Sequence, residues 1–345
     1  MLLCHLILVY VKDSGKSSGR RFAAELNPTV IHLPHNSCKL KPTVPGISSA
    51  KVIINTRSGM SNKEEVRRRL AEVFDGSGVT AQITLAESGV KVAELAREAA
   101  RGDWTVIVAG GGDGTINAVA SAVVGSDKIL GVLPLGTLNH FARDLKIPND
   151  LDLAARAIAS GRIISVDVGE VNGRIFLNNS SLGLYPTMVL EREKEQRLGA
   201  GKWPAFVWAA VTVFRRYPFL DVRLSVDGRE FRRRTPFVFV GNNEYAMERL
   251  NIGLRERLDR GQLSLYITHR TGRWGLIRLA LRALFGRLRE EKDFLALCTK
   301  EIRVQTRHKR LRVAFDGEVD VLETPLHYRV RPGALRVIVP NKEDA

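Results

Sequence analysis

Between residues 51 and 160 the chain alternates short apolar runs with stretches of helical spacing, and this alternation restricts the fold more than any other feature. The apolar runs lie at 52–54, 81–85, 106–108 and 129–133, and helical spacing is found at 62–74, 89–101, 114–124, 138–145 and 151–160. The runs lack polar alternation, which is typical of strands covered on both faces. The pattern predicts parallel βαβ units, so we expect an α/β domain over residues 50–164.

The pattern changes after about residue 162, where polar and apolar residues begin to alternate as in antiparallel strands. This alternation covers 163–185, 219–240, 262–268, 302–305, 311–315 and 326–339, and helical stretches interrupt it at 191–216 and 272–290. The dipeptide Asp227-Gly228 supplies the positive φ angles of a tight hairpin turn. We therefore expect a mostly antiparallel β domain over residues 165–340.

Composition limits the possible partners and surroundings. The net charge of +16 favours anionic partners, namely a nucleotide, a nucleic acid or an acidic membrane surface, although it also fits a solvated arginine-rich surface. No run of about 18 uncharged apolar residues is present, so we expect no transmembrane helix. Residues 1–49 carry Pro, Ser, Asn and Gly without a period and predict a poorly ordered leader. Three scattered cysteines favour a reducing cytosol over a disulfide framework.

Three glycines and a carboxylate end the third apolar run, in VIVAGGGDGTIN at residues 106–117. This stretch is neither a P-loop nor a dinucleotide fingerprint. Glycines after a strand nevertheless let the backbone approach a ligand, and the helix that follows offers free N–H groups to phosphate. Asp113 would repel phosphate unless a cation lay between them, which points to Mg²⁺.

The sequence Gly-Thr-x-Asn occurs twice, at Gly114–Asn117 and again at Gly136–Asn139, each time between an apolar run and a helical stretch. If the two strands are neighbours, both turns lie at the end of the sheet where open α/β sheets bind ligands. The alternative is two ordinary turns with Thr or Asn helix caps. Two copies together with the glycine run favour a phosphate site.

Three stretches occur along the chain in a fixed order: GGGDGTIN, LPLGTLNHFARDL and the later AFDGE. On these three stretches the chain resembles the diacylglycerol kinase catalytic-domain family, which includes bacterial lipid kinases and sphingosine kinases. The family pattern is G-G-D-G-T-x-N, then P-x-G-T-x-N-D-F-A, then D-G-E. The resemblance covers roughly residues 50–340, and it is the order of several motifs that makes it specific, because NAD kinases share G-G-D-G-T. It implies an NAD kinase-like α/β domain, a C-terminal antiparallel β-sandwich, and an active site between them.

The resemblance also implies roles for single residues. It implies ATP contacts at Asn55, Thr84, Gly111, Gly112, Asp113, Gly114, Thr115, Ile116, Asn117, Gly136 and Thr137. It implies Mg²⁺ as a cofactor, touched by Asp113 directly or through water. Glu318 matches the family's catalytic base, and Asp113, the second expected catalytic residue, would orient metal or water around the phosphates. From the residues alone, Asp316-Gly317-Glu318 fits a hairpin turn like the one at Asp227; the family match favours the base.

Three positions depart from the family pattern. His140 stands where the family usually has Asp, and Glu244–Arg249 replaces a glycine-rich stretch. Arg260 stands where some members have an Asp that binds an accessory Mg²⁺, so we do not expect that accessory site here. The departures fall mainly on the substrate side, which leaves the identity of the lipid open.

A lipid substrate requires contact with a bilayer. Basic and aromatic residues mix at 202–217 and 270–290, which fits either an interfacial amphipathic helix or a core helix with a solvated arginine face. The clusters Arg232–Arg234 and Arg307–Arg310 add positive charge. We expect a cytoplasmic kinase of phospholipid biosynthesis, peripherally associated with an anionic membrane surface, that phosphorylates diacylglycerol or a related lipid. A homodimer stays open.

Two other functions remain open at this point. One is an NAD kinase-like or other small-molecule kinase, because the glycine motif is shared. The other is a non-catalytic basic module that binds membrane or nucleic acid. The chain has no recognition motif for nucleic acid, and we therefore expect none as a partner.

Overall fold

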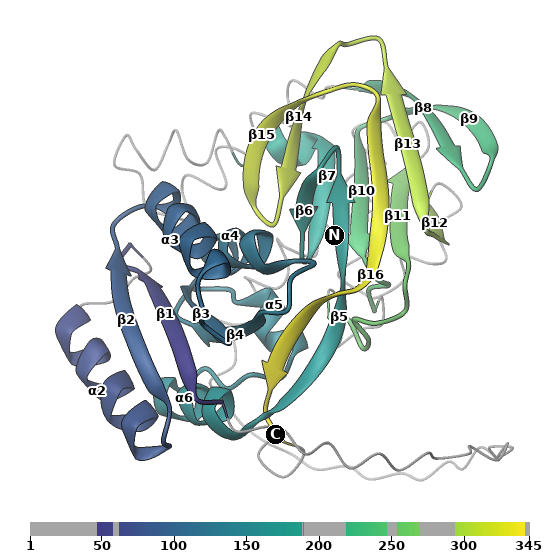
Figure 1. Cartoon of the computed structure of the whole chain (residues 1–345). Helices are drawn as coiled ribbons and strands as arrows, with labels where there is room; N and C mark the ends of the chain where they lie inside the picture. The colour runs from purple at the N-terminus through teal and green to yellow at the C-terminus, as the bar shows by residue number, and fades with distance from the viewer. Residues whose placement is uncertain are drawn as a thin grey trace, which may run out of the picture.

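The computed structural model describes residues 47–57, 62–187, 189, 219–246, 254–268 and 294–341. Within them an α/β domain comes first and an antiparallel β-sandwich second, which confirms the expected fold class (Figure 1). Most of the expected leader lies outside the described residues. The same is true of the two expected helices at 191–216 and 272–290, and of the basic aromatic segments at 202–217 and 270–290.

The α/β domain alternates strands and helices as the periodicity predicts. Its elements are β1 (Ser49–Asn55), α2 (Lys63–Gly76), β2 (Thr80–Ala86), α3 (Gly89–Arg101), β3 (Val106–Gly111), α4 (Asp113–Val123), β4 (Ile129–Pro134), α5 (His140–Asp144) and α6 (Leu151–Ser160). The strands are parallel in the order β2-β1-β3-β4. Every residue of β3 and β4 is buried, because helices cover both faces of the sheet. Both glycine loops follow these two central strands.

The β-sandwich contains the remaining strands. They are β5 (Arg162–Val171), β6 (Arg174–Phe176), β7 (Asn179–Gly183), β8 (Leu220–Val226), β9 (Arg229–Thr235), β10 (Phe237–Asn242), β11 (Leu263–Thr268), β12 (Phe294–Thr299), β13 (Glu301–Thr306), β14 (Arg310–Phe315), β15 (Glu318–Glu323) and β16 (Leu326–Val339). One sheet has the order β12-β11-β10-β7-β14-β15, and it faces β16-β13-β8-β9 across a core of apolar side chains.

The strands β5 and β16 belong to both domains. The first half of β16 pairs with β13, and its second half joins the parallel sheet beside β4, through Arg336 and Val337 (Figure 1). Leu326 packs in the sandwich core, whereas Leu335 and Val337 pack in the α/β core. β5 runs antiparallel to β16 along most of its length. These two strands fix one domain against the other, and the expected division at residue 165 falls within β5.

Two Asp-Gly turns close hairpins in the sandwich. Asp227 and Gly228 have φ angles of 48° and 76°, and Asp316 and Gly317 have 45° and 94°. Each pair joins strands whose flanking residues are directly opposite, which is the geometry of a two-residue turn. The second turn places Glu318 at the start of β15. The turn and the proposed catalytic role at Asp316-Gly317-Glu318 are therefore compatible.

Candidate active site

A cleft of about 1020 Å³ lies between α3 and α4 of the first domain and β6 and the β14–β15 hairpin of the second. Many residues expected to bind ATP line it, together with the expected base. They are Asn55, Gly112, Gly114, Thr115, Asn117, Gly136, Thr137 and Glu318. Two motifs about 200 residues apart in the chain therefore meet in one cavity.

The two glycine loops pack directly against each other at the ends of β3 and β4. A Cβ at Gly136 would overlap the Cα of Gly112, so the contact requires a residue without a side chain. Asn139 braces the second loop: its Oδ1 accepts from Gly136 N at 3.0 Å, and its Nδ2 donates to Pro134 O at 3.1 Å. Neither α4 nor α5 starts with a side-chain cap, so the alternative of two Thr- or Asn-capped turns is not what the structure shows.

Thr115 joins the first loop to β1. Its Oγ1 accepts a hydrogen bond from Asn55 Nδ2 at 3.0 Å, and Asn55 Oδ1 accepts from Arg57 N at 3.1 Å. A side chain at Gly111 would overlap Thr115. The glycine at 111 thus makes room for the threonine rather than for a ligand.

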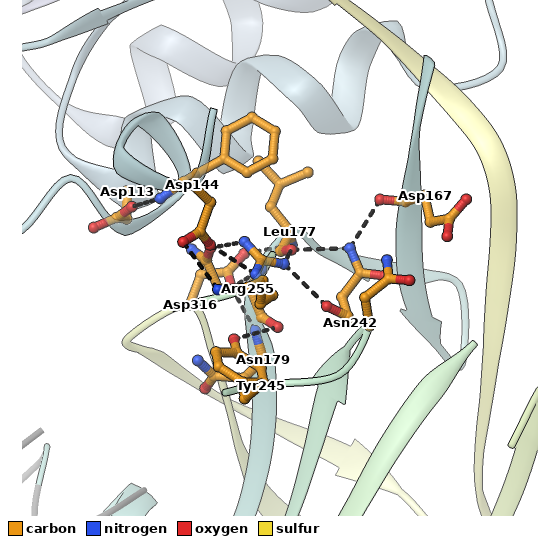
Figure 2. A network of polar contacts seen from close by, with 12 residues as sticks. Asp113, Asp144, Asp167, Leu177, Asn179, Asn242, Tyr245, Arg255 and Asp316 are labelled. Atoms are coloured by element: carbon orange, nitrogen blue, oxygen red, sulfur yellow. Dashed lines mark hydrogen bonds and ion pairs between the residues drawn. The ribbon is translucent and has the colours of Figure 1, made fainter. Parts of the chain in front are cut away.

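Four residues expected at the nucleotide are not among those that line the cleft: Thr84, Gly111, Asp113 and Ile116. Thr84 Oγ1 accepts from Lys51 Nζ at 3.0 Å, and Ile116 is fully buried in the core. Asp113 Oδ1 accepts from Phe141 N at 3.2 Å, which ties the start of α4 to α5 (Figure 2). The expected ATP and metal contacts of these residues stay predictions.

Glu318 reaches across the cleft from β15 to the first turn of α4. Its Oε1 would overlap a Cβ placed on Gly114, and its Cδ is 3.3 Å from that Cβ position. The amino end of a helix carries partial positive charge and favours a carboxylate. The candidate base therefore faces the backbone that the sequence predicts to bind phosphate.

Asp316 anchors the turn that carries Glu318. Its Oδ2 accepts from Leu177 N at 2.8 Å and from Asn117 Nδ2 at 2.8 Å, and its Oδ1 accepts from Asn178 N at 2.8 Å and Asn179 N at 3.0 Å. Burial raises the pKa of this carboxyl to about 6, although the backbone hydrogen bonds act in the opposite direction. The carboxylate is thus enclosed by donors from both domains.

Beside the contacts of Asp316, Arg255 organises a polar network that sequence reasoning missed (Figure 2). Its side chain is 0% exposed, and its Nε donates to Asp144 Oδ2 at 2.7 Å. Its Nη atoms donate to Leu177 O at 2.6 Å and to Asn178 Oδ1 at 2.7 Å. Burial raises the pKa of Asp144, and Arg255 counteracts the rise. Nothing in the sequence distinguishes this arginine from the many on the surface.

Three arginines that were not predicted also line the cleft, namely Arg57, Arg97 and Arg174. All three are exposed, and Arg174 Nη2 lies 2.7 Å from Asp320 Oδ2. Arg57 follows two residues after Asn55, an expected ATP contact, whereas Arg97 and Arg174 have no local signature. Their charge makes the cleft suitable for an anion.

The carboxylates that line the cleft are Glu318 and Asp320, and no group of three or more His, Cys, Asp or Glu suited to a metal occurs among the described residues. Mg²⁺ usually keeps several waters and binds one or two carboxylates together with substrate phosphates. The donors present therefore fit a Mg²⁺ that arrives with a nucleotide, and not a metal held by protein alone.

The positions that depart from the family pattern are partly explained. Burial, with Arg143 and Arg255 nearby, lowers the pKa of His140 to about 4, so this residue stays neutral at pH 7. Arg260 Nη1 lies 3.5 Å from Glu244 Oε2, so two of the departures contact each other.

No helix among the described residues is both long and apolar enough to cross a membrane.

Comparison with known proteins agrees with this geometry. The model of the diacylglycerol kinase catalytic domain matches residues 49–171, and that of the YegS C-terminal NAD kinase beta sandwich-like domain matches residues 186–339. Diacylglycerol kinases of Staphylococcus aureus strains bovine RF122 and MRSA252 are each 29% identical over 229 residues, which cover 64% of this chain and 71% of theirs.

Solved structures resemble the fold over most of the chain. A Bacillus anthracis protein assigned as a diacylglycerol kinase has a TM-score of 0.70 at 22% identity, covering 88% of this chain and 100% of its own. A second structure of a diacylglycerol kinase from that organism has a TM-score of 0.65 at 18% identity, with the same coverage. The two family models together span both domains, and with these relatives they indicate a lipid kinase built on a diacylglycerol kinase catalytic domain.

Proposed function

We propose that this protein transfers the γ-phosphoryl group of ATP to the hydroxyl of diacylglycerol or a related lipid. In this reaction the bond between the γ-phosphorus and the oxygen of the leaving ADP breaks. A new bond forms between that phosphorus and the lipid oxygen, and the hydroxyl proton passes to Glu318. The observation that carries the proposal is the position of the Glu318 carboxylate over Gly114, at the amino end of α4.

The nucleotide phosphates would lie on the two packed glycine loops. Gly112, Gly114 and Gly136 line the cleft and leave the backbone open to a ligand, and α4 begins there without a side-chain cap. Arg57 and Arg97 would neutralise phosphate charge from the α3 side of the cleft. When bound, Mg²⁺ would neutralise the charge between the β- and γ-phosphates.

Asp113 has a narrower role in this proposal than the sequence suggested. Its Oδ1 accepts from Phe141 N, which holds the start of α4 against α5. Among the described residues no hydrogen bond reaches its Oδ2. That oxygen is the one left for Mg²⁺, directly or through water.

We further propose peripheral contact with an anionic bilayer. In the strand register of β8, β9 and β13, Arg223 lies opposite Arg232, and Arg234 and Arg303 lie on the same outer face. All four side chains are exposed. Replacing Arg232 and Arg234 by Glu should lower the fraction of protein that sediments with vesicles containing phosphatidylserine, and should leave turnover of detergent-dispersed lipid unchanged. Equal sedimentation of the variant and the wild-type protein would contradict the proposed membrane contact.

The central experiment is phosphate transfer from labelled ATP to diacylglycerol, a sphingoid base, NAD and a total lipid extract in parallel. Diacylglycerol or another lipid should be labelled, and Glu318→Gln should lower that rate by about 100-fold or more, as expected for loss of a general base. Glu323→Gln is the matched control, because Glu323 is an exposed glutamate at the far end of the same strand. Labelling of NAD alone, or full turnover by Glu318→Gln, would refute the proposal.

A further inference from the structure

The turn that carries Glu318 is fastened to the second domain through one carboxylate. Asp316 accepts hydrogen bonds from the backbone N–H groups of Leu177, Asn178 and Asn179, and its own N–H donates to Asn179 O at 3.0 Å. Three amides on one carboxylate hold the turn in a single orientation.

A fourth hydrogen bond ties the same carboxylate to the first domain. Asn117 on α4 donates from Nδ2 to Asp316 Oδ2 at 2.8 Å. Its Oδ1 accepts from Ser121 Oγ at 3.2 Å, one helical turn further on. This second bond fixes the orientation of the amide, so that its N–H₂ group faces Asp316.

The two contacts between the turn and α4 have matched spacing. Gly114 and Asn117 are three residues apart and therefore share one face of the helix. Glu318 meets the first of them, and Asp316, on the other side of Gly317, meets the second. Sliding the turn along α4 would break both contacts together.

The second Asp-Gly turn shows that a tight turn does not need an enclosed carboxylate. Asp227 has nearly the same φ as Asp316, 48° against 45°. Asp227 is exposed, and its carboxylate accepts from Thr299 Oγ1 at 2.7 Å. Desolvating a carboxylate costs free energy, so the enclosed position of Asp316 is explained by its partners and not by the turn.

We infer that Asp316, held by Asn117, is a positioning residue that sets where the Glu318 carboxylate stands over the amino end of α4. The inference rests on the proposed role of Glu318 as the base. It also reassigns Asn117, which the sequence predicts to bind ATP, from nucleotide binding to the positioning of Glu318.

The main test compares Asp316→Asn with Asp227→Asn. Asn accepts a positive φ angle, so both variants keep their turns. At position 316, however, the new N–H₂ group faces donors instead of accepting from them. We expect Asp316→Asn to lower kcat by about 100-fold, the order expected for a catalytic group displaced by about 1 Å. Its dissociation constant for ATP, measured by calorimetry, should change less than about twofold, and Asp227→Asn should match wild type.

Asn117→Ala provides a second variant, which leaves the three backbone bonds of Asp316 in place. The inference requires a lower kcat with unchanged ATP affinity. It also requires that neither Asn117→Ala nor Asp316→Asn lowers the residual rate of Glu318→Gln further. Weaker ATP binding with unchanged kcat would make Asn117 a nucleotide ligand and overturn the inference, as would additive losses with Glu318→Gln.

Amide hydrogen exchange tests the inference independently of activity. Exchange at residues 177–179 and 316 should accelerate in Asp316→Asn and stay at wild-type rates in Asp227→Asn. If wild type labels no lipid, the proposed function fails, and exchange alone decides whether Asp316 fastens the turn. Unchanged exchange in Asp316→Asn would overturn the inference even in an active enzyme.

Discussion

Gly114→Ala is the substitution that tests the geometry of the cleft most directly. Gly114 lies in the first turn of α4 and does not have a positive φ angle, so the backbone itself accepts alanine. The new Cβ would nevertheless lie too close to Glu318 Oε1, at a separation that real Cβ atoms do not adopt. The carboxylate has to move, while the helix and both loops keep their backbone.

The contacts give the size of the effect. Ordinary contact begins at 3.4 Å, so Oε1 must move by about 1 Å, a displacement that can cost roughly 100-fold in rate. That loss corresponds to about 2.7 kcal/mol in the activation barrier. Alanine in place of glycine stabilises a helix by up to about 1 kcal/mol, and weakening the contact of Glu318 with the helix end costs about 0.3–1 kcal/mol. The free energy of unfolding should therefore change little while kcat falls steeply.

The assay measures kcat for the labelled lipid and the melting temperature of the same preparations. Gly76→Ala is the matched control, because Gly76 ends α2 with nothing within 4 Å of a new Cβ. It should keep full activity. Gly114→Ala should lose about 100-fold in kcat, yet should not lower the residual rate of Glu318→Ala, where no carboxylate remains to be displaced.

Two results would refute this reasoning. Full activity in Gly114→Ala would mean that Glu318 does not act from the position seen in the structure. An equal loss in the wild-type and Glu318→Ala backgrounds would mean that the new methyl group acts on the nucleotide and not on the base.

Three further predictions concern charges around the cleft. Arg255→Met leaves Asp144 enclosed without its cation and should lower the free energy of unfolding, measured in urea, by about 3–5 kcal/mol. A loss under about 1 kcal/mol would show that Arg255 does not hold the polar network around Asp144 together. Because the pKa of Asp316 is raised from 3.8 to about 6, the folded protein holds this proton more tightly than the unfolded chain, so its contribution to stability grows as the pH falls from 7 to 5. Urea titrations at both pH values should show wild type gaining stability relative to Asp316→Asn, and an equal pH dependence of the two would exclude the raised pKa. The pKa of His140 is lowered from 6.5 to about 4, so the unfolded chain binds this proton first and the protein loses stability as the pH falls from 6.5 to about 4. His140→Gln should lose less stability than wild type over this pH interval. Identical losses would show that the histidine is not held neutral.

Much of the fold could be predicted because it depends on local periodicity. The expected helix at 89–101 coincides with α3, and the apolar runs at 106–108 and 129–133 lie within β3 and β4. The Asp-Gly turn at residue 227 is present, because positive φ angles are a property of those two residues. Strands and tight turns of this kind are encoded within a few residues of the chain.

The site was only partly predictable, because motif position gives the neighbourhood of a residue and not the direction of its side chain. Thr115 lies in an expected loop, yet its hydroxyl bonds to Asn55. Asp113 was expected at a metal; its Oδ1 accepts from the backbone of α5, and the metal contact stays a prediction. Arg255 could not have been singled out, since Asp144 and Asn178, which accept hydrogen bonds from its side chain, lie more than 70 residues away in the chain.

The sequence by itself determined the class of each domain and the two glycine loops, because periodicity, glycine and turn residues act over short distances. Only the tertiary structure decided that Glu318 meets Gly114 and that Asp316 meets Asn117. Those contacts depend on β5 and β16, which run through both domains and set one against the other. Residues about 200 positions apart in the chain become neighbours only when such long-range strand pairing has formed.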